Sequence, residues 1–236
     1  MNNLQKRILT SLIILPLSLF FVVKGGYYLF FFLMAVFFIA NFELLTVFNK
    51  RSTILILDLI LILSLFSIYY LANGITLYIL LWAIILCVCS DVGGYIFGRI
   101  FKWKKLTKIS PKKTVSGVLG SFAFSLFSVF IIHIIAIKPN LTDNFLPPMN
   151  SLINFLDPKY FFLAIIFSLV AQVGDLTISY FKRVEKIKDT GKILPGHGGL
   201  LDRVDGIIFA LPFAYIYLIG PAAYFEKWKN IFLINA

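Results

Sequence analysis

The residues best suited to chemistry lie between positions 175 and 205. Asp175, Ser179 and Lys182 are spaced i, i+4 and i+7, so they share one face of a helix. Asp202 and Asp205 follow about one turn apart, at the start of the next apolar run. Carboxylates among basic side chains, beside a glycine-rich loop, can hold a divalent metal and a polyphosphate. The alternative is a solvated charged loop with one buried salt bridge.

The loop between these carboxylates contains Gly191 and the run Gly196-His197-Gly198-Gly199. This glycine content disfavours a helix. We therefore expect backbone N–H groups in the loop to be free for an anionic ligand.

A second polar group runs from Ser90-Asp91 to Ser110-Pro111-Lys112-Lys113-Thr114. Asp91 stands at the mouth of an apolar run beside Arg99, where a polar site and a packing role are both open. The basic stretch fits contact with lipid headgroups, and it also fits a helix start that binds phosphate. Gly94 and Gly98 form a small-xxx-small pair, which predicts close helix packing.

Apolar helices must position these residues. The chain has 236 residues, of which 60 % are hydrophobic and 14 % charged, against about 45–50 % and about 25 % in ordinary globular proteins. This composition excludes a soluble domain, a disordered chain and a disulfide scaffold. We expect an all-α polytopic integral membrane protein with about seven transmembrane helices. The apolar runs are 8–23, 25–48, 53–71, 75–91, 114–137, 160–180 and 206–225.

The distribution of basic residues predicts the orientation. With the N-terminus inside, 17 of the 22 Lys and Arg residues fall on the inner side, as the positive-inside rule requires. Loops 99–113 and 182–205 are then both cytoplasmic. The net charge of +11 thus reflects topology in a bacterial-type inner membrane, and we expect no nucleic-acid partner. We divide the chain into N-terminal transmembrane helices (1–85) and a catalytic transmembrane region (86–236).

The segment from Ser179 to Asp205 resembles the signature of phosphatidate cytidylyltransferases, the CDP-diacylglycerol synthases. The matching positions are Ser179-x-Phe181-Lys182-Arg183, Lys188-Asp189-x-Gly191, Leu194-Pro195-x-His197-Gly198-Gly199-Leu200 and Asp202-Arg203-Val204-Asp205. The groups around Asp91 and Lys112 resemble an upstream block of the same family. Ser116 is a departure, because the family usually has Glu there. The first 85 or so residues match only in being hydrophobic.

The resemblance implies transfer of a cytidylyl group from CTP to phosphatidate, with Mg²⁺ and with or without a second ion. It implies catalytic roles for Asp175, Ser179, Lys182, Arg183, Asp202 and Asp205, with Asp175 and Asp202 as metal ligands. It also implies that substrates are bound by Lys112, Lys113, Thr114, Lys188, Asp189, His197, Gly198, Gly199, Arg203 and Asp91.

Other functions compete with this hypothesis. A transporter would also carry intramembrane Asp175 and Gly-rich breaks, but the charges cluster at one face and no inverted repeat is present. The protein could also be another CTP-dependent lipid enzyme, such as a polyprenol kinase, and only the signature between Ser179 and Asp205 distinguishes the two. A pseudoenzyme that holds membrane partners together is disfavoured by the intact signature. The glycine pairs are also compatible with a homodimer.

Overall fold

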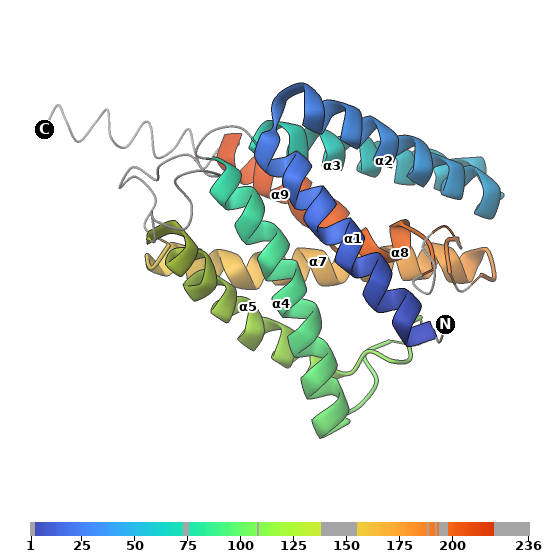
Figure 1. Ribbon diagram of the computed structural model, residues 1–236. Coiled ribbons are helices and arrows are strands. Elements are labelled where there is room, and N and C mark those ends of the chain that lie inside the picture. Colours follow the sequence, from blue (N-terminus) through green and yellow to red (C-terminus); the bar gives the residue numbers. More distant parts are fainter. Residues whose placement is uncertain are drawn as a thin grey trace, which may run out of the picture.

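The computed structural model describes residues 3–72, 76–107, 109–137, 155–187, 189–191, 193 and 198–219, and these form a helical bundle without strands (Figure 1). The elements are α1 (Asn3–Lys24), α2 (Gly26–Val47), α3 (Arg51–Leu71), α4 (Leu77–Phe101), α5 (Val115–Ile137), α7 (Pro158–Val184), α8 (Leu201–Val204) and α9 (Ile207–Ile219). The all-α prediction is confirmed for this part of the chain.

In the part of the chain that the structure describes, five helices are long and apolar enough to cross a membrane, namely α2, α3, α4, α5 and α7. Shorter apolar segments lie in α1 (Leu12–Lys24) and α9 (Ile207–Tyr217). Each predicted apolar run therefore corresponds to a helix, and five of these helices reach the length of a span within the described residues. Residues 220–225 of the last predicted run lie outside the described residues. The protein is an integral membrane protein.

Two predicted loops begin later than the sequence indicated. We expected loops at 99–113 and 182–205, but α4 continues to Phe101 and α7 to Val184. Apolar residues define the membrane-spanning part of each helix, whereas backbone hydrogen bonds continue the helix beyond that part. Helix α4 ends where Lys102 adopts a left-handed conformation and its N–H bonds the Gly98 carbonyl.

Helices α4 and α5 pack against each other through glycines. A Cβ added to Gly120 would lie 2.5 Å from the Gly93 carbonyl oxygen. A Cβ added to Gly117 would lie 2.9 Å from the Gly94 carbonyl oxygen. The predicted close packing is confirmed, and it is made within one chain. These glycines therefore give no argument for a homodimer.

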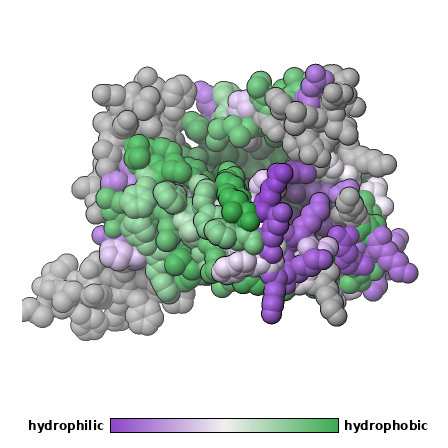
Figure 2. Space-filling view, turned by 90° about the horizontal axis from the view of Figure 1, so that it is seen from below, coloured by the Kyte–Doolittle hydropathy of each residue, from purple (hydrophilic) through white to green (hydrophobic). Residues whose placement is uncertain are grey.

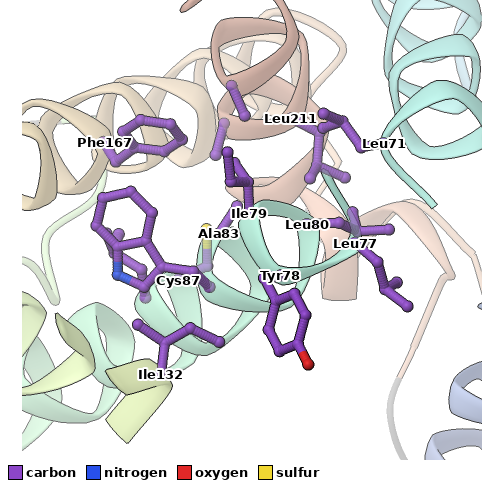
Figure 3. Packing of buried hydrophobic residues seen from close by; sticks show 14 of the residues in the cluster. Leu71, Leu77, Tyr78, Ile79, Leu80, Ala83, Cys87, Ile132, Phe167 and Leu211 are labelled. Carbon is purple, nitrogen blue, oxygen red and sulfur yellow. The ribbon is translucent and has the colours of Figure 1, made fainter. Parts of the chain in front are cut away.

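The main core surrounds the first half of α4 (Figure 3). Leu80, Ala83 and Leu86 are fully buried there, and Cys87 packs among them as a free thiol. A second buried cluster joins α2 and α3 to α7, α8 and α9 through Leu44, Leu57 and Ile178, with others. This second cluster places the end of α2 beside the segment that carries Asp202.

Candidate active site

A cavity of about 350 Å³ unites the two polar groups that the sequence singled out. It lies among α4, the segment before α5, α7 and α8. Figure 2 shows hydrophilic residues gathered toward the end of the molecule where Figure 1 places α8. The lining of the cavity includes Asp91, Tyr95, Ser110, Lys112, Lys113, Thr114, Gln172, Asp175, Asp202 and Asp205. Residues of both predicted basic loops therefore line one cavity.

The segment before α5 folds back on itself and thereby presents its lysines. The Leu106 N–H donates to the Lys113 carbonyl at 2.8 Å, and Val115 N–H donates to the Lys104 carbonyl at 3.0 Å. Thr114 caps α5, because its hydroxyl accepts the Gly117 N–H at 3.1 Å. Ser116 is buried and shares a 3.0 Å hydrogen bond with the Thr114 hydroxyl.

The first ion pair of the cavity joins the two predicted groups. Lys113 Nζ lies 2.7 Å from Asp175 Oδ2, so a basic residue before α5 meets an acidic residue of α7. The Ser179 hydroxyl donates to Asp175 Oδ1 at 3.3 Å. This bond confirms that the i and i+4 positions of α7 share a face.

The second ion pair joins α7 to α8. Lys182 Nζ lies 2.8 Å from Asp202 Oδ1, and both side chains are largely buried. Asp202 Oδ2 accepts the N–H groups of Thr190 at 2.8 Å and Gly199 at 3.2 Å. A buried carboxylate that accepts several donors is held in one orientation.

Four amides in the described parts of the loop are engaged, contrary to our expectation that the loop amides would be free for a ligand. Those of Thr190 and Gly199 donate to Asp202, and those of Leu200 and Leu201 donate to Glu43. Glycine content shows that amides are not committed to a helix, but it cannot show which carboxylates reach them. Gly198 has φ +91°, a left-handed conformation that favours glycine.

Asp205, between α8 and α9, has a pKa well above that of an ordinary aspartate. Burial and, after it, the neighbouring Asp175 carboxylate raise the pKa of Asp205 to about 7. The Gly206 N–H donates to Asp205 Oδ1 at 2.9 Å and partly offsets this rise. Asp91 lines the same cavity from α4.

Several predicted residues lie away from the cavity lining. Arg183 is exposed and donates to the carbonyls of Ile109 at 3.4 Å and Ile187 at 3.1 Å. It thereby joins the segment before α5 to the end of α7. Asp189 and Arg203 are also exposed and do not line the cavity. Lys188 and His197 lie outside the described residues.

Glu43 of α2 is a contributor that sequence reasoning missed. Its side chain is buried, and its carboxylate accepts the Leu200 and Leu201 N–H groups at 2.9 and 3.2 Å. The available signal was a single acidic residue near the end of an otherwise uncharged run.

The cavity has the donors that a hard divalent cation prefers. No three acidic, histidine or cysteine side chains in the described ranges group closely enough to hold a metal alone. Mg²⁺ is commonly held by one or two carboxylates together with substrate phosphates. The carboxylates of Asp175 and Asp202, both at the cavity wall, therefore fit Mg²⁺ bound with a nucleotide.

Comparison with known proteins places the chain in a family. The model of the cytidylyltransferase family matches residues 53–219. The chain belongs to this family. All the cavity-lining residues, from Asp91 to Asp205, fall within the matched range. Glu43 falls outside it.

Members of the cytidylyltransferase family from bacteria resemble this chain in sequence. It is 39 % identical over 155 residues to a phosphatidate cytidylyltransferase of Staphylococcus haemolyticus, covering 65 % of this chain and 54 % of that protein. It is 37 % identical over 144 residues to one of Haemophilus influenzae, covering 60 % and 46 %. The chain thus spans about half the length of the curated relatives it matches.

Proposed function

We propose that this protein transfers the cytidylyl group of CTP to phosphatidate, giving CDP-diacylglycerol and pyrophosphate. The observation that carries the proposal is the cavity lined by Lys113, Asp175 and Asp202, in which Lys113 pairs with Asp175 and Asp202 is held by Lys182. Family membership and the names of the similar bacterial proteins support it. Those names favour this activity over a CTP-dependent lipid kinase, and they give no support to a transporter.

The reaction forms one phosphorus–oxygen bond and breaks another. A phosphate oxygen of phosphatidate attacks the α-phosphorus of CTP, and the bond from that phosphorus to the bridging oxygen of the β-phosphate breaks. The attacking oxygen is already anionic near pH 7, so no general base is needed. The obstacle is repulsion between two anions, and fixed charges are the means of lowering it.

The lysines are placed to lower that repulsion. Lys113, from the segment before α5, and Lys182, from α7, reach the cavity region from two sides. We assign the exposed Lys112 and the half-buried Lys113, with Thr114, to the lipid phosphate, and Lys182 to the nucleotide phosphates. Ser179 donates a hydrogen bond to Asp175 and so orients it.

Bound Mg²⁺ would supply charge neutralisation at the phosphates. Asp175 and Asp202 are the residues we assign to hold it, with Asp205 as a further acceptor and with or without a second ion. In their present pairs these aspartates neutralise Lys113 and Lys182. Substrate phosphate and metal together would give each member of a pair a new partner of opposite charge.

The membrane arrangement we propose follows from the charges. All seven apolar helices would contact the bilayer, with the N-terminus and both basic loops in the cytoplasm, where CTP is available. The cytoplasmic side, near the nucleotide, would then also hold Arg183, Lys188, Asp189, His197 and Arg203. A homodimer would have to use a surface other than the α4–α5 glycines, which pack within the chain.

The test is an assay of the purified chain in mixed micelles with α-labelled CTP, phosphatidate and Mg²⁺. Parallel reactions lack one component each. We expect label in the lipid phase only when all three are present. Absence of transfer by folded protein would contradict the proposal and direct attention to Ser116, where the family usually has Glu.

A further inference from the structure

We propose that Glu43 is a positioning residue that fixes the Asp202 carboxylate at the cavity by holding the turn before it. The role in catalysis rests on the proposed cytidylyl transfer, whereas the contact itself does not. Glu43 does not line the cavity, so any effect on the reaction must pass through other residues.

Glu43 holds the start of α8 with both carboxylate oxygens. Oε1 accepts the Leu200 N–H at 2.9 Å, and Oε2 accepts the Leu201 N–H at 3.2 Å. The first N–H groups of a helix need acceptors from outside the helix. Leu200, the residue at the N-cap, makes no side-chain cap bond, so a carboxylate from another helix takes that role.

Glycines in the loop make room for the Glu43 carboxylate. A Cβ on Gly191 would lie 2.6 Å from Glu43 Oε1, and one on Gly199 would lie 2.8 Å from Oε2. Real Cβ atoms do not approach so closely, and the Glu43 side chain is 1 % exposed and cannot move into solvent. Gly191 and Gly199 therefore serve the docking of α2, in addition to any role toward a nucleotide.

Glu43 and Asp202 share the amides of one turn. Asp202 takes the Thr190 and Gly199 N–H groups, while Glu43 takes the next two along the chain, those of Leu200 and Leu201. Leu201 directly precedes Asp202. Three consecutive amides just before Asp202, those of Gly199, Leu200 and Leu201, are therefore held by carboxylates, and this leaves Asp202 little freedom to move away from Lys182 and the cavity wall.

A glutamine at position 43 would keep the volume but lose half of the interaction. Its amide has one acceptor oxygen and one NH₂ group, and that NH₂ would face a backbone N–H. One buried N–H would lose its acceptor, and an unmatched buried donor is costly. Glu43→Gln therefore removes a hydrogen bond to the turn while keeping the volume of the side chain.

Glu185→Gln is the matched control. Glu185 also accepts a backbone N–H, that of Lys50 at 3.2 Å, and it also receives the Asn49 side chain. It joins the end of α7 to the α2–α3 connection rather than to the amides of the turn at 199–202. The same change of side chain there should leave the cavity as it is.

The experiment compares both variants with wild type, using the full chain in detergent. Hydrogen exchange followed by mass spectrometry reports on the 199–202 turn, and labelled CTP transfer gives kcat and KM. For Glu43→Gln we expect exchange at this turn to rise at least about tenfold. We expect kcat to fall about tenfold to a hundredfold, as the loss of a hydrogen bond to a charged group allows. The half-maximal Mg²⁺ concentration should rise, while the KM for phosphatidate should stay within about twofold.

Three results would overturn the positioning role. They are wild-type exchange and kcat in Glu43→Gln, a lower kcat with unchanged exchange at 199–202, and faster exchange throughout the bundle. If Glu43→Gln fails to fold, Gly191→Ala tests the same contact from the loop, and it should show the same local exchange and lower kcat. Inactive wild-type protein would instead contradict the proposed reaction. The difference in hydrogen exchange between wild type and Glu43→Gln would still decide whether Glu43 holds the turn.

Discussion

The helices before residue 77 and those after it carry polar groups in different ways. From α4 onward, four aspartates and two lysines line one cavity: Asp91, Asp175, Asp202, Asp205, Lys112 and Lys113. In α1 to α3, the buried Glu43 meets the catalytic region through the backbone amides of Leu200 and Leu201 and does not line the cavity. The family model begins at residue 53, within α3, and continues through the later helices to residue 219.

The difference shows that a region without a recognisable motif can still set the geometry of a site. The division at residue 85 describes where the motifs lie. It does not describe independent structures, because one buried cluster spans α2, α3, α7, α8 and α9. The variants below separate residues that would touch substrates from residues that hold the site.

Asp175→Asn should have the largest effect. It removes a charge from the cavity and leaves Lys113 without its 2.7 Å partner. We expect transfer to fall by at least about 10²–10³-fold, the range for loss of one electrostatic group at a reacting centre. The readout is lipid-phase label, with thermal unfolding in detergent as the control for folding. Near-normal activity at saturating Mg²⁺ would remove Asp175 from the metal assignment.

Lys113→Ala should have the next largest effect. It removes a cation that we assign to the lipid phosphate, so the KM for phosphatidate should rise about tenfold or more while the KM for CTP changes less. Separate titrations of the two substrates make the measurement. A rise in the KM for CTP alone would reverse the assignment of the two basic segments.

Asp205 should give the protein a pH dependence. Its pKa of about 7 lies above that of an unfolded aspartate, so folding favours its protonated form. That contribution to stability is complete at low pH and is lost as pH rises through about 7. Thermal unfolding from pH 5 to 9, without divalent cations, should show this fall in wild type. Asp205→Asn should flatten it, and an equal fall in the variant would assign the titration elsewhere.

Asn41→Ala should have the smallest effect on activity. Asn41 is on α2 near Glu43, but it donates to Asp58 Oδ1 of α3 at 3.0 Å rather than to the turn before Asp202. We expect stability to fall by about 1–3 kcal/mol because Asp58 loses its donor, with kcat within about twofold of wild type. A loss of kcat as large as in Glu43→Gln would erase the distinction between anchoring the turn and packing the helices.

Sequence reasoning found the helices because apolar runs and bilayer length are local properties. It also placed Asp175, Ser179 and Lys182 on one face, since helical spacing determines that directly. It did not foresee the loop amides' partners, because Glu43 and Leu200 are 157 residues apart and only the packing of α2 on α8 joins them. It also did not foresee that Arg183 turns to the Ile109 and Ile187 carbonyls rather than to the cavity.

Cytidylyl transfer is tested most directly by asking which phosphate of CTP reaches the lipid. Wild-type protein is given phosphatidate and Mg²⁺ with CTP labelled at either the α- or the γ-phosphate. Cytidylyl transfer predicts that only the α-label enters the lipid and that the γ-label leaves as pyrophosphate. Entry of the γ-label into lipid would mean phosphoryl transfer, and it would contradict the account.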